Sequence, residues 1–178
     1  MTQNASSFKV IRNHIPAQCK KQLFYAHVHS RIQYGIEVYG IASSGNLKKV
    51  QVMQNRILKN LFTKDWFTPT GNLHHQLQML QVQDIFRSRV AQFVHKCLNG
   101  RIPGVFQNYY KTVNQLHNHR TRQSQKLHVA KTRTKIGEKS VKIIGAKMYN
   151  DLPEHITDCK TDKSFKNKRK LHILDGYM

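Results

Sequence analysis

The sequence predicts a mainly α fold, in which a helical bundle precedes an irregular basic segment with a small β-hairpin and short C-terminal helices. Four stretches before residue 110 repeat apolar side chains at three- and four-residue spacing, whereas residues 111–137 show no helical period. A chain of 178 residues with 39% hydrophobic side chains can bury a core. We therefore expect a helical domain over 1–110 and a basic C-terminal segment over 111–178.

The first helix is expected over residues 17–34. Phe24, Val28 and Ile32 repeat every four residues. Pro16 stands just before the start, where its missing N–H costs nothing.

Residues 47–62, LKKVQVMQNRILKNLF, have the most regular helical pattern in the chain, and Asn46 is a candidate N-cap. At about 100° per residue the apolar side chains share one side and the basic ones fall within an arc of roughly 100° opposite. The basic arc consists of Lys48, Lys49, Arg56 and Lys59, with Val52 among them. A solvated lysine face would explain the pattern, but such faces usually mix signs, and no acid occurs between Glu37 and Asp65.

Further helices are predicted over 73–80, 82–100 and 161–174, the last beginning at Thr161 as N-cap. Two short alternating runs, Leu127–Ala130 and Ser140–Ile144, are expected to pair as a hairpin. Residues 146–153 are expected to form a helical turn ended by a proline.

The chain carries 30 Lys and Arg against 9 Asp and Glu, a net charge of +21. Residues 1–110 hold 14 basic and 3 acidic side chains, and residues 111–178 hold 16 and 6. Both parts are therefore cationic, which favours a long contact with phosphates over a single basic tether. We expect the stretch over 116–137 to be a partly ordered, extended segment that grips a polyanion.

No pattern in the sequence indicates catalysis or a cofactor. The acids are scattered, and no phosphate-cradling glycine loop or nucleophile motif occurs. The 11 histidines lack the cysteine or carboxylate partners of a metal site. We expect neither a cofactor nor a metal. Tyr109 and Tyr110 could stack on exposed bases or belong to the core, and Tyr149 is expected to pack.

The three cysteines lie far apart, and the sequence shows neither a secretory signal nor an apolar run long enough for a membrane helix. We therefore expect a nuclear or cytoplasmic protein that is not secreted and has no membrane partner.

Several segments in order resemble the region after the palm in non-LTR retrotransposon reverse transcriptases of the jockey and CR1 type. They are LFYAHVHSRIQYGIEVYG, LKKVQVMQNRILKNLF, HNHRTRQ, GEKSVKIIGAKMYNDLP and SFKNKRKL. The resemblance implies a thumb-like helical bundle, with the helices at 17–39 and 47–62 as thumb helices, followed by an ordered C-terminal piece. The family's Tyr or Phe-Ala-Asp-Asp motif, palm and fingers are absent from these 178 residues.

The resemblance implies a non-catalytic fragment of an RNA-directed DNA polymerase that clamps template and primer through their phosphates. The expected partners are RNA, DNA or both, and the palm and fingers of a parent polymerase. The alternative is a stand-alone interaction or architectural protein derived from a retroelement. The candidate nucleic-acid contacts are Arg31, Lys48, Lys49, Arg56, Lys59, His119, Arg120, Arg122, Lys126, Lys131, Arg133, Lys135 and Lys139.

Overall fold

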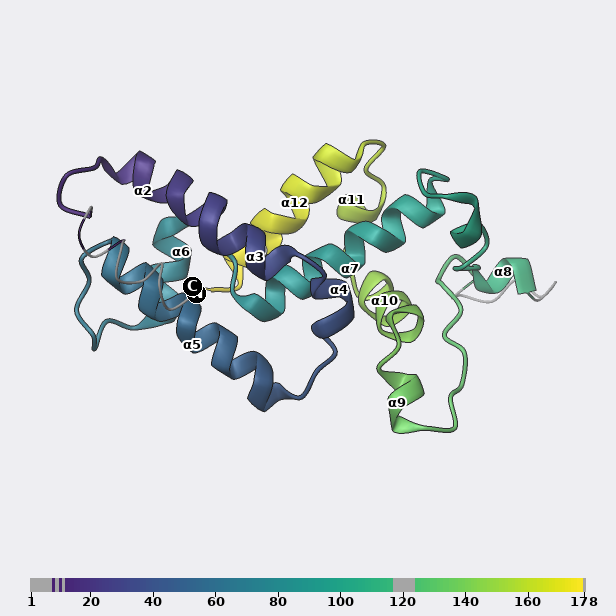
Figure 1. The fold of residues 1–178 in the computed structure, drawn as a ribbon. Coiled ribbons are helices and arrows are strands. Elements are labelled where there is room, and N and C mark those ends of the chain that lie inside the picture. The colour runs from purple at the N-terminus through teal and green to yellow at the C-terminus, as the bar shows by residue number, and fades with distance from the viewer. Residues whose placement is uncertain (1–7, 9, 11, 117–123, 178) are drawn as a thin grey trace. The chain divides into compact units, whose positions relative to one another are not determined.

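The computed structural model describes residues 8, 10, 12–116 and 124–177, and this part of the chain is mainly helical, as predicted (Figure 1). Contacts divide the chain into two compact units, Met1–Phe86 with Ile173–Met178, and Arg87–His172. The boundary at residue 110, which divides the chain by periodicity and charge, stays a prediction.

The first unit begins with the predicted helix over 17–34, which consists of α2 (Ala17–Phe24), the π-helical turn η1 (Tyr25–His29) and α3 (Ser30–Gln33). Phe24, Val28 and Ile32 are all buried. Side chains four residues apart drift by about 40° on an α-helix. The wider turn of a π-helix offsets this drift, so the π segment keeps the three side chains on one buried face.

Gly35 ends this helix with φ of 64°, a left-handed conformation that glycine adopts without strain. The short helix α4 (Ile36–Tyr39) follows, and Ile36 joins the same buried face. The Tyr39 hydroxyl donates a hydrogen bond to the Ile32 carbonyl, which ties α4 back to α3.

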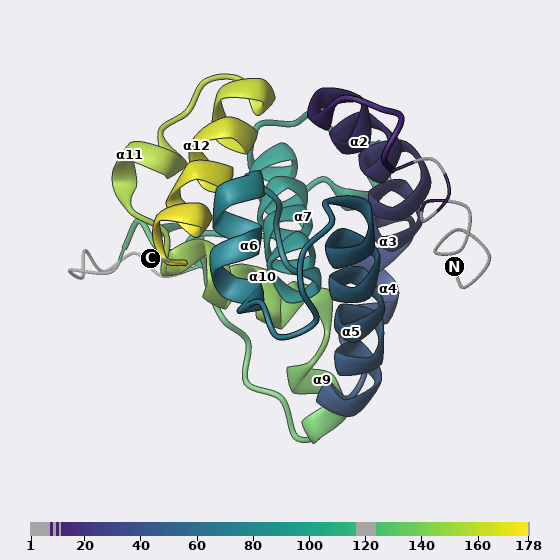
Figure 2. The ribbon, with the colours of Figure 1, turned by 90° about the vertical axis from the view of Figure 1, so that its left-hand side faces the viewer.

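Helix α5 (Ser44–Leu61) contains the predicted helix over 47–62 and can be followed along its length in Figure 2. It begins three residues earlier than predicted, so the prediction of Asn46 as N-cap is wrong. Ser43 is the N-cap residue, and its carbonyl accepts from the Asn46 and Leu47 amides at 3.0 and 3.2 Å. Ser44, Gly45 and Asn46 have little helix propensity of their own. They are helical because the apolar residues further along α5 stabilise the helix through packing.

The first unit continues with α6 (Thr70–Leu77) and the start of α7 (Val82–Leu98), close to the predicted helices over 73–80 and 82–100. Gln78 ends α6 in the left-handed conformation, with φ of 56°. Gly100, with φ of 65°, follows the end of α7, as its sequence position predicts.

The second unit has its own hydrophobic core. The C-terminal part of α7, α10 (Val141–Asn150), α11 (Glu154–Thr157) and α12 (Asp162–Asp175) contribute to it. The short elements η2 (Gly104–Phe106) and α8 (Val113–Leu116) lie in the same unit. The buried members are Ala91, Val94, Tyr110, Leu127, Ala146, Tyr149, Ile156, Cys159 and Phe165. Thr161 caps α12 as predicted, since its Oγ1 accepts from the Ser164 amide at 3.2 Å.

The predicted β-hairpin is wrong, because its second half is helical. Lys135–Glu138 form the short helix α9, and Ser140–Ile144 open α10 instead of a strand. Ser140 is the N-cap, and its Oγ accepts from the Ile143 amide at 3.4 Å. Val141, Ile144 and Met148 also fit a helical period, and the capped helix uses that period rather than the alternation.

The first half of the predicted hairpin pairs with a different segment. The His128 amide donates to the Lys111 carbonyl at 2.8 Å, and the Val113 amide donates to the Lys126 carbonyl at 2.9 Å. Thr112 and Leu127 form an isolated antiparallel bridge, and the described residues contain no longer β-ladder. From residue 124 onward, the described part of the 116–137 stretch therefore begins with a turn, continues as an extended segment from Leu127 to about Thr132, and ends in the first residues of α9.

Candidate nucleic-acid interface

Helix α5 separates its apolar and basic side chains onto opposite sides. Ile57, Leu58 and Leu61 have no exposed surface. Lys48, Lys49 and Arg56 are exposed and Lys59 is half-buried. We call Lys48, Lys49, Val52, Arg56 and Lys59 the α5 basic face. The helix contains no acidic residue, so these cations lack compensating charge on their own element.

Buried polar side chains fix the orientation of α5 within the first unit. Gln54 is fully buried, and its Nε2 donates to the Leu80 carbonyl at 2.9 Å. The Gln51 Oε1 accepts from the Val82 amide at 2.7 Å. These two contacts hold the inner side of the helix, and so they determine which side chains face outward.

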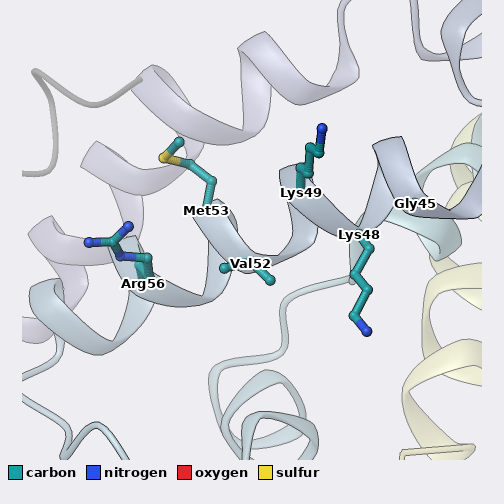
Figure 3. Close-up of a pocket in the computed structure, with 6 residues that line it drawn as sticks. All are labelled: Gly45, Lys48, Lys49, Val52, Met53 and Arg56. Carbon is teal, nitrogen blue, oxygen red and sulfur yellow. The ribbon is translucent and has the colours of Figure 1, made fainter.

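Three depressions border α5, two of them along its basic face and one where the helix meets Gln81–Gln83. The largest, of about 380 Å³, is bordered by Lys48, Lys49, Val52, Met53, Arg56 and Gly45 (Figure 3). Figure 3 shows Lys48 and Lys49 extending to opposite sides of the helix, with Val52 between Lys48 and Arg56. A second depression, of about 220 Å³, shares Lys48. A third, of about 200 Å³, shares Val52 and Arg56 and adds Lys59 and Trp66.

The loop after α5 brings an aromatic side chain back to its basic face. The Arg56 guanidinium carbon lies 5.7 Å from the Trp66 ring centroid, and the Lys59 Nζ lies 5.9 Å from it. Both distances are within cation–π range. Trp66 nevertheless remains 63% exposed and the next residue, Phe67, 92% exposed.

The sequence prediction did not include Trp66 and Phe67, because it considered only the tyrosines that flank the basic segment. A signal was available. Residues 65–69, DWFTP, lie between α5 and α6 and have no helical period, so no periodic apolar face accounts for the two adjacent aromatics.

A second group of predicted contacts lies on the ordered basic segment of the second unit. Lys126, Lys131, Arg133, Lys135 and Lys139 are all exposed. The backbone of this segment is held at Leu127, whose amide donates to Asn150 Oδ1 at 2.8 Å and whose carbonyl accepts from Asn150 Nδ2 at 2.9 Å. The fixed backbone at Leu127 lets Lys126 and Lys131 project from an extended stretch, whereas Lys135 lies in α9 and Lys139 directly follows that helix.

The remaining predicted contacts are not brought to either group. Arg31 is exposed on α3 and is separate from the residues that border the three depressions. His119, Arg120 and Arg122 lie outside the described residues.

The tyrosines near the basic segment belong mainly to the core. Tyr110 is buried, and its hydroxyl donates to the Val141 carbonyl at 3.0 Å. Tyr149 is buried as predicted, and burial raises its pKa to about 12. Tyr109 is half-buried against Phe93, with the Lys142 Nζ 5.2 Å from its ring. Tyr110 is thus a packing residue and not a stacking platform.

The buried histidines make contacts typical of structural residues. His95 is 1% exposed and stacks on Phe165 with 4.2 Å between ring centroids. Its Nδ1 lies 3.3 Å from the Tyr149 hydroxyl, and burial lowers its pKa. In the part of the chain that the structure describes, no group of three or more His, Cys, Asp or Glu could hold a metal ion.

Burial raises the pKa of the Cys97 thiol to about 11, so this cysteine is protonated near neutral pH and is a poor nucleophile.

Among the described helices, none is both long and apolar enough to cross a membrane.

The chain is similar to parts of RNA-directed DNA polymerases of mobile elements. It is 28% identical over 88 residues to the polymerase from mobile element jockey of Drosophila funebris, which is 49% of this chain and 10% of that protein. It is 22% identical over 85 residues to the jockey polymerase of Drosophila melanogaster, 48% of this chain and 9% of that protein. A probable RNA-directed DNA polymerase from transposon X-element of Drosophila melanogaster is 29% identical over 61 residues, 34% of this chain and 7% of that protein.

These similarities confirm the resemblance to jockey-type retrotransposon polymerases that the sequence motifs predict. The matched segment spans about a tenth of the length of the two jockey polymerases. No family model matches the chain, and no solved structure matches it.

Proposed function

Because the chain is similar to part of jockey-type RNA-directed DNA polymerases, we propose that it binds the sugar–phosphate backbone of a template–primer through the α5 basic face. In this role it acts as the thumb and C-terminal region of such a polymerase and clamps the nucleic acid without taking part in bond formation. The observation that carries the proposal is the α5 basic face itself, a set of cations on a helix that contains no acidic residue and whose opposite side is buried.

The dimensions of the α5 basic face suit a nucleic-acid strand. From residue 48 to residue 59 the helix rises about 16 Å, at 1.5 Å per residue. One DNA strand places a phosphate about every 3.4 Å along the helix axis, so this length matches about five phosphates. Lys48 stands near one end of the face and Lys59 near the other, so a single strand or one edge of a duplex that runs along the helix can contact both.

Salt dependence of binding tests the proposal. Lys48→Gln with Lys59→Gln removes two phosphate contacts, so the slope of log K against log salt should become shallower by about 1.4 to 1.8. Affinity for RNA, duplex DNA and an RNA–DNA hybrid would be measured by fluorescence anisotropy of labelled oligonucleotides at several salt concentrations.

The matched control is Lys163→Gln with Lys166→Gln, two exposed lysines of α12 that remove the same net charge. A specific interface changes the slope only in the α5 variant. Equal slopes for the two variants would mean that binding follows overall charge, and would reject the α5 basic face as the site.

A second candidate function, docking onto a protein partner, is favoured by one specific observation. Tyr34 is 86% exposed and Val38 76% exposed, on neighbouring turns around Gly35. The palm or fingers of a parent polymerase, or a partner of a stand-alone protein, could cover these side chains. Light scattering of the purified chain, compared with a Tyr34→Ser, Val38→Ser variant, tests this. Self-association that the variant abolishes would support a protein-interaction role.

A further inference from the structure

We propose that Trp66 and Phe67 form a stacking platform for unpaired bases of a single strand whose phosphates lie on the α5 basic face. This inference rests on the proposed function and narrows it, because it names single-stranded nucleic acid, or the unpaired end of a duplex, as the ligand at this end of α5.

The platform is built from exposed aromatics beside positive charge. Trp66 is 63% exposed and Phe67 92% exposed, in the loop between α5 and α6. Exposed aromatic side chains next to a basic groove are the usual way in which proteins hold single strands, because every base has a face that can stack.

The cations lie where the strand backbone would pass. Arg56 and Lys59 approach the Trp66 ring to 5.7 and 5.9 Å, and both belong to the α5 basic face. A base stacked on Trp66 would bring its own phosphates to the same two cations. The depression of about 200 Å³ that Trp66 borders is smaller than the roughly 300 to 1,000 Å³ of pockets for whole small molecules, and suits one planar ring.

The loop is ordered well enough to present the rings. The Lys59 Nζ donates to the Trp66 carbonyl, and the Lys64 amide donates to the Lys59 carbonyl at 2.9 Å. Thr63 adopts φ of 53°, which turns the chain back toward α5. The Thr68 amide donates to the Asp65 carbonyl at 3.0 Å and closes a turn around the two aromatics. A preorganised loop loses little conformational entropy when a base binds.

Charge favours a nucleic acid over a protein as the occupant. An apolar protein surface at this site would have to cover the three cations Arg56, Lys59 and Lys64. The loop sequence contains one acid, Asp65, which can neutralise at most one of them. Burying unpaired cations is costly, and phosphates pair with them.

Trp66 is the only tryptophan of the chain, so intrinsic fluorescence reports on this loop alone. We would titrate the wild-type chain with three oligonucleotides of equal length: a single strand, an abasic single strand with the same phosphates, and a blunt duplex. The base-containing single strand is expected to quench Trp66, while the abasic strand and the blunt duplex bind with little quenching.

Variants separate stacking from charge. Trp66→Leu with Phe67→Leu keeps apolar bulk and the net charge but removes the aromatic rings. Its affinity for the single strand, measured by anisotropy, should fall by roughly 5- to 150-fold for each base that no longer stacks. Affinity for the abasic strand and the slope of log K against log salt should not change. Trp66→Phe should restore most of the binding, since a smaller ring still stacks.

Three results would overturn the inference. The first is equal quenching by base-containing and abasic strands. The second is an equal loss of affinity for all three ligands in the leucine variant. The third is Trp66 emission that shifts with protein concentration in the absence of nucleic acid, which would mean that the aromatics face a second protein. The proposed function fails by a different result, an unchanged salt slope in the Lys48→Gln, Lys59→Gln variant, so the two failures are distinguishable.

Discussion

The Nε2 of His74 lies 2.9 Å from the Oδ1 of Asn55, in a partly buried contact between α6 and α5. The other ring nitrogen, Nδ1, lies 3.1 Å from the Met79 carbonyl and donates to it. When the ring is neutral, Nε2 can therefore accept a hydrogen bond from the side-chain Nε2 of Gln51, 3.4 Å away. When the ring is protonated, Nε2 can instead donate to the Oδ1 of Asn55. The protonation state of one buried histidine is thus coupled to the side chains that position α5.

This coupling makes the stability of the first unit depend on pH. Burial lowers the pKa of His74, and the hydrogen bond to Met79 and the Asp84 charge oppose that effect. An unfolded histidine has a pKa of about 6.5. Between the folded pKa and about 6.5 the unfolded chain binds more protons, so the free energy of unfolding rises with pH through this window. The stabilising contribution is complete above the window and is lost as pH falls through it.

Urea unfolding at about pH 7.5 and about pH 5.5 checks this prediction. The wild type should be less stable at the lower pH. His74→Gln should reduce the difference, because it removes the titrating group. Burial also lowers the pKa of His95 in the second unit, so part of the pH dependence should survive in the variant. His75→Gln is the matched control, since the His75 ring makes none of these contacts, and a reduction as large as that of His74→Gln would contradict the assignment.

Gly145 is expected to be required for packing of the second unit. A Cβ at this position would lie 2.4 Å from the Tyr110 hydroxyl and 3.0 Å from a methyl group of Val94. Because Tyr110 is fixed by its hydrogen bond to Val141, Gly145→Ala should lower the free energy of unfolding by about 1 to 3 kcal/mol. Thermal or urea unfolding measures the effect.

A double-mutant cycle shows whether Tyr110 is the cause. In a Tyr110→Phe background the closest atom is gone, so Gly145→Ala should cost less than in the wild type. Strictly additive effects would mean that the clash lies elsewhere. Gly45→Ala is a matched control, since nothing lies within 4 Å of its added Cβ, and it should be neutral or slightly stabilising.

The Ser140 cap is expected to be the local signal that makes residues 141–150 helical. Ser140→Ala removes the acceptor of the Ile143 amide and should cost about 0.5 to 2 kcal/mol of stability. Ser140→Asp, which can also cap, should restore most of it. Hydrogen exchange of the first turn of α10 is the direct measurement. Unchanged protection of these amides in Ser140→Ala would show that tertiary packing alone starts the helix.

Ser140 also illustrates what the sequence could and could not predict. The α5 basic face was predicted correctly as a helix with segregated charge, because spacing and charge over 18 residues are local properties. The run at 140–144 fits both a strand and a helix over five residues, and its cap and the following residues decide between them. Short alternating runs are ambiguous for this reason.

The missed features depend on contacts between residues distant in sequence or on turns. Trp66 reaches α5 only because the backbone reverses at Thr63, whose positive φ no periodicity indicates. The extended segment at 124–130 pairs with 111–114 and with Asn150, 23 residues further along. Neither contact follows from composition. Loop conformation and long-range hydrogen bonds are thus the parts of this fold that sequence patterns leave undetermined.

The ordered basic segment of the second unit should add its own share of nucleic-acid binding. Replacing its exposed cations with glutamine should reduce the slope of log K against log salt by about 0.7 to 0.9 for each phosphate that the segment no longer binds. The residues to replace are Lys126, Lys131, Arg133, Lys135 and Lys139. The Leu127–Asn150 hydrogen bonds order the backbone beside Lys126, and α9 orders it at Lys135, so these cations lose mainly side-chain freedom on binding.

Asn150 provides a control that leaves every charge in place. Asn150→Ala removes both hydrogen bonds to Leu127 and should loosen the segment, which makes binding weaker because the backbone must then be ordered at the moment of contact. The salt slope should stay close to that of the wild type, since the number of phosphates bound is unchanged. A charge-neutralised segment that leaves the slope unaltered would show instead that these cations face solvent in the complex. The order of the segment would then serve the packing of Leu127 in the core.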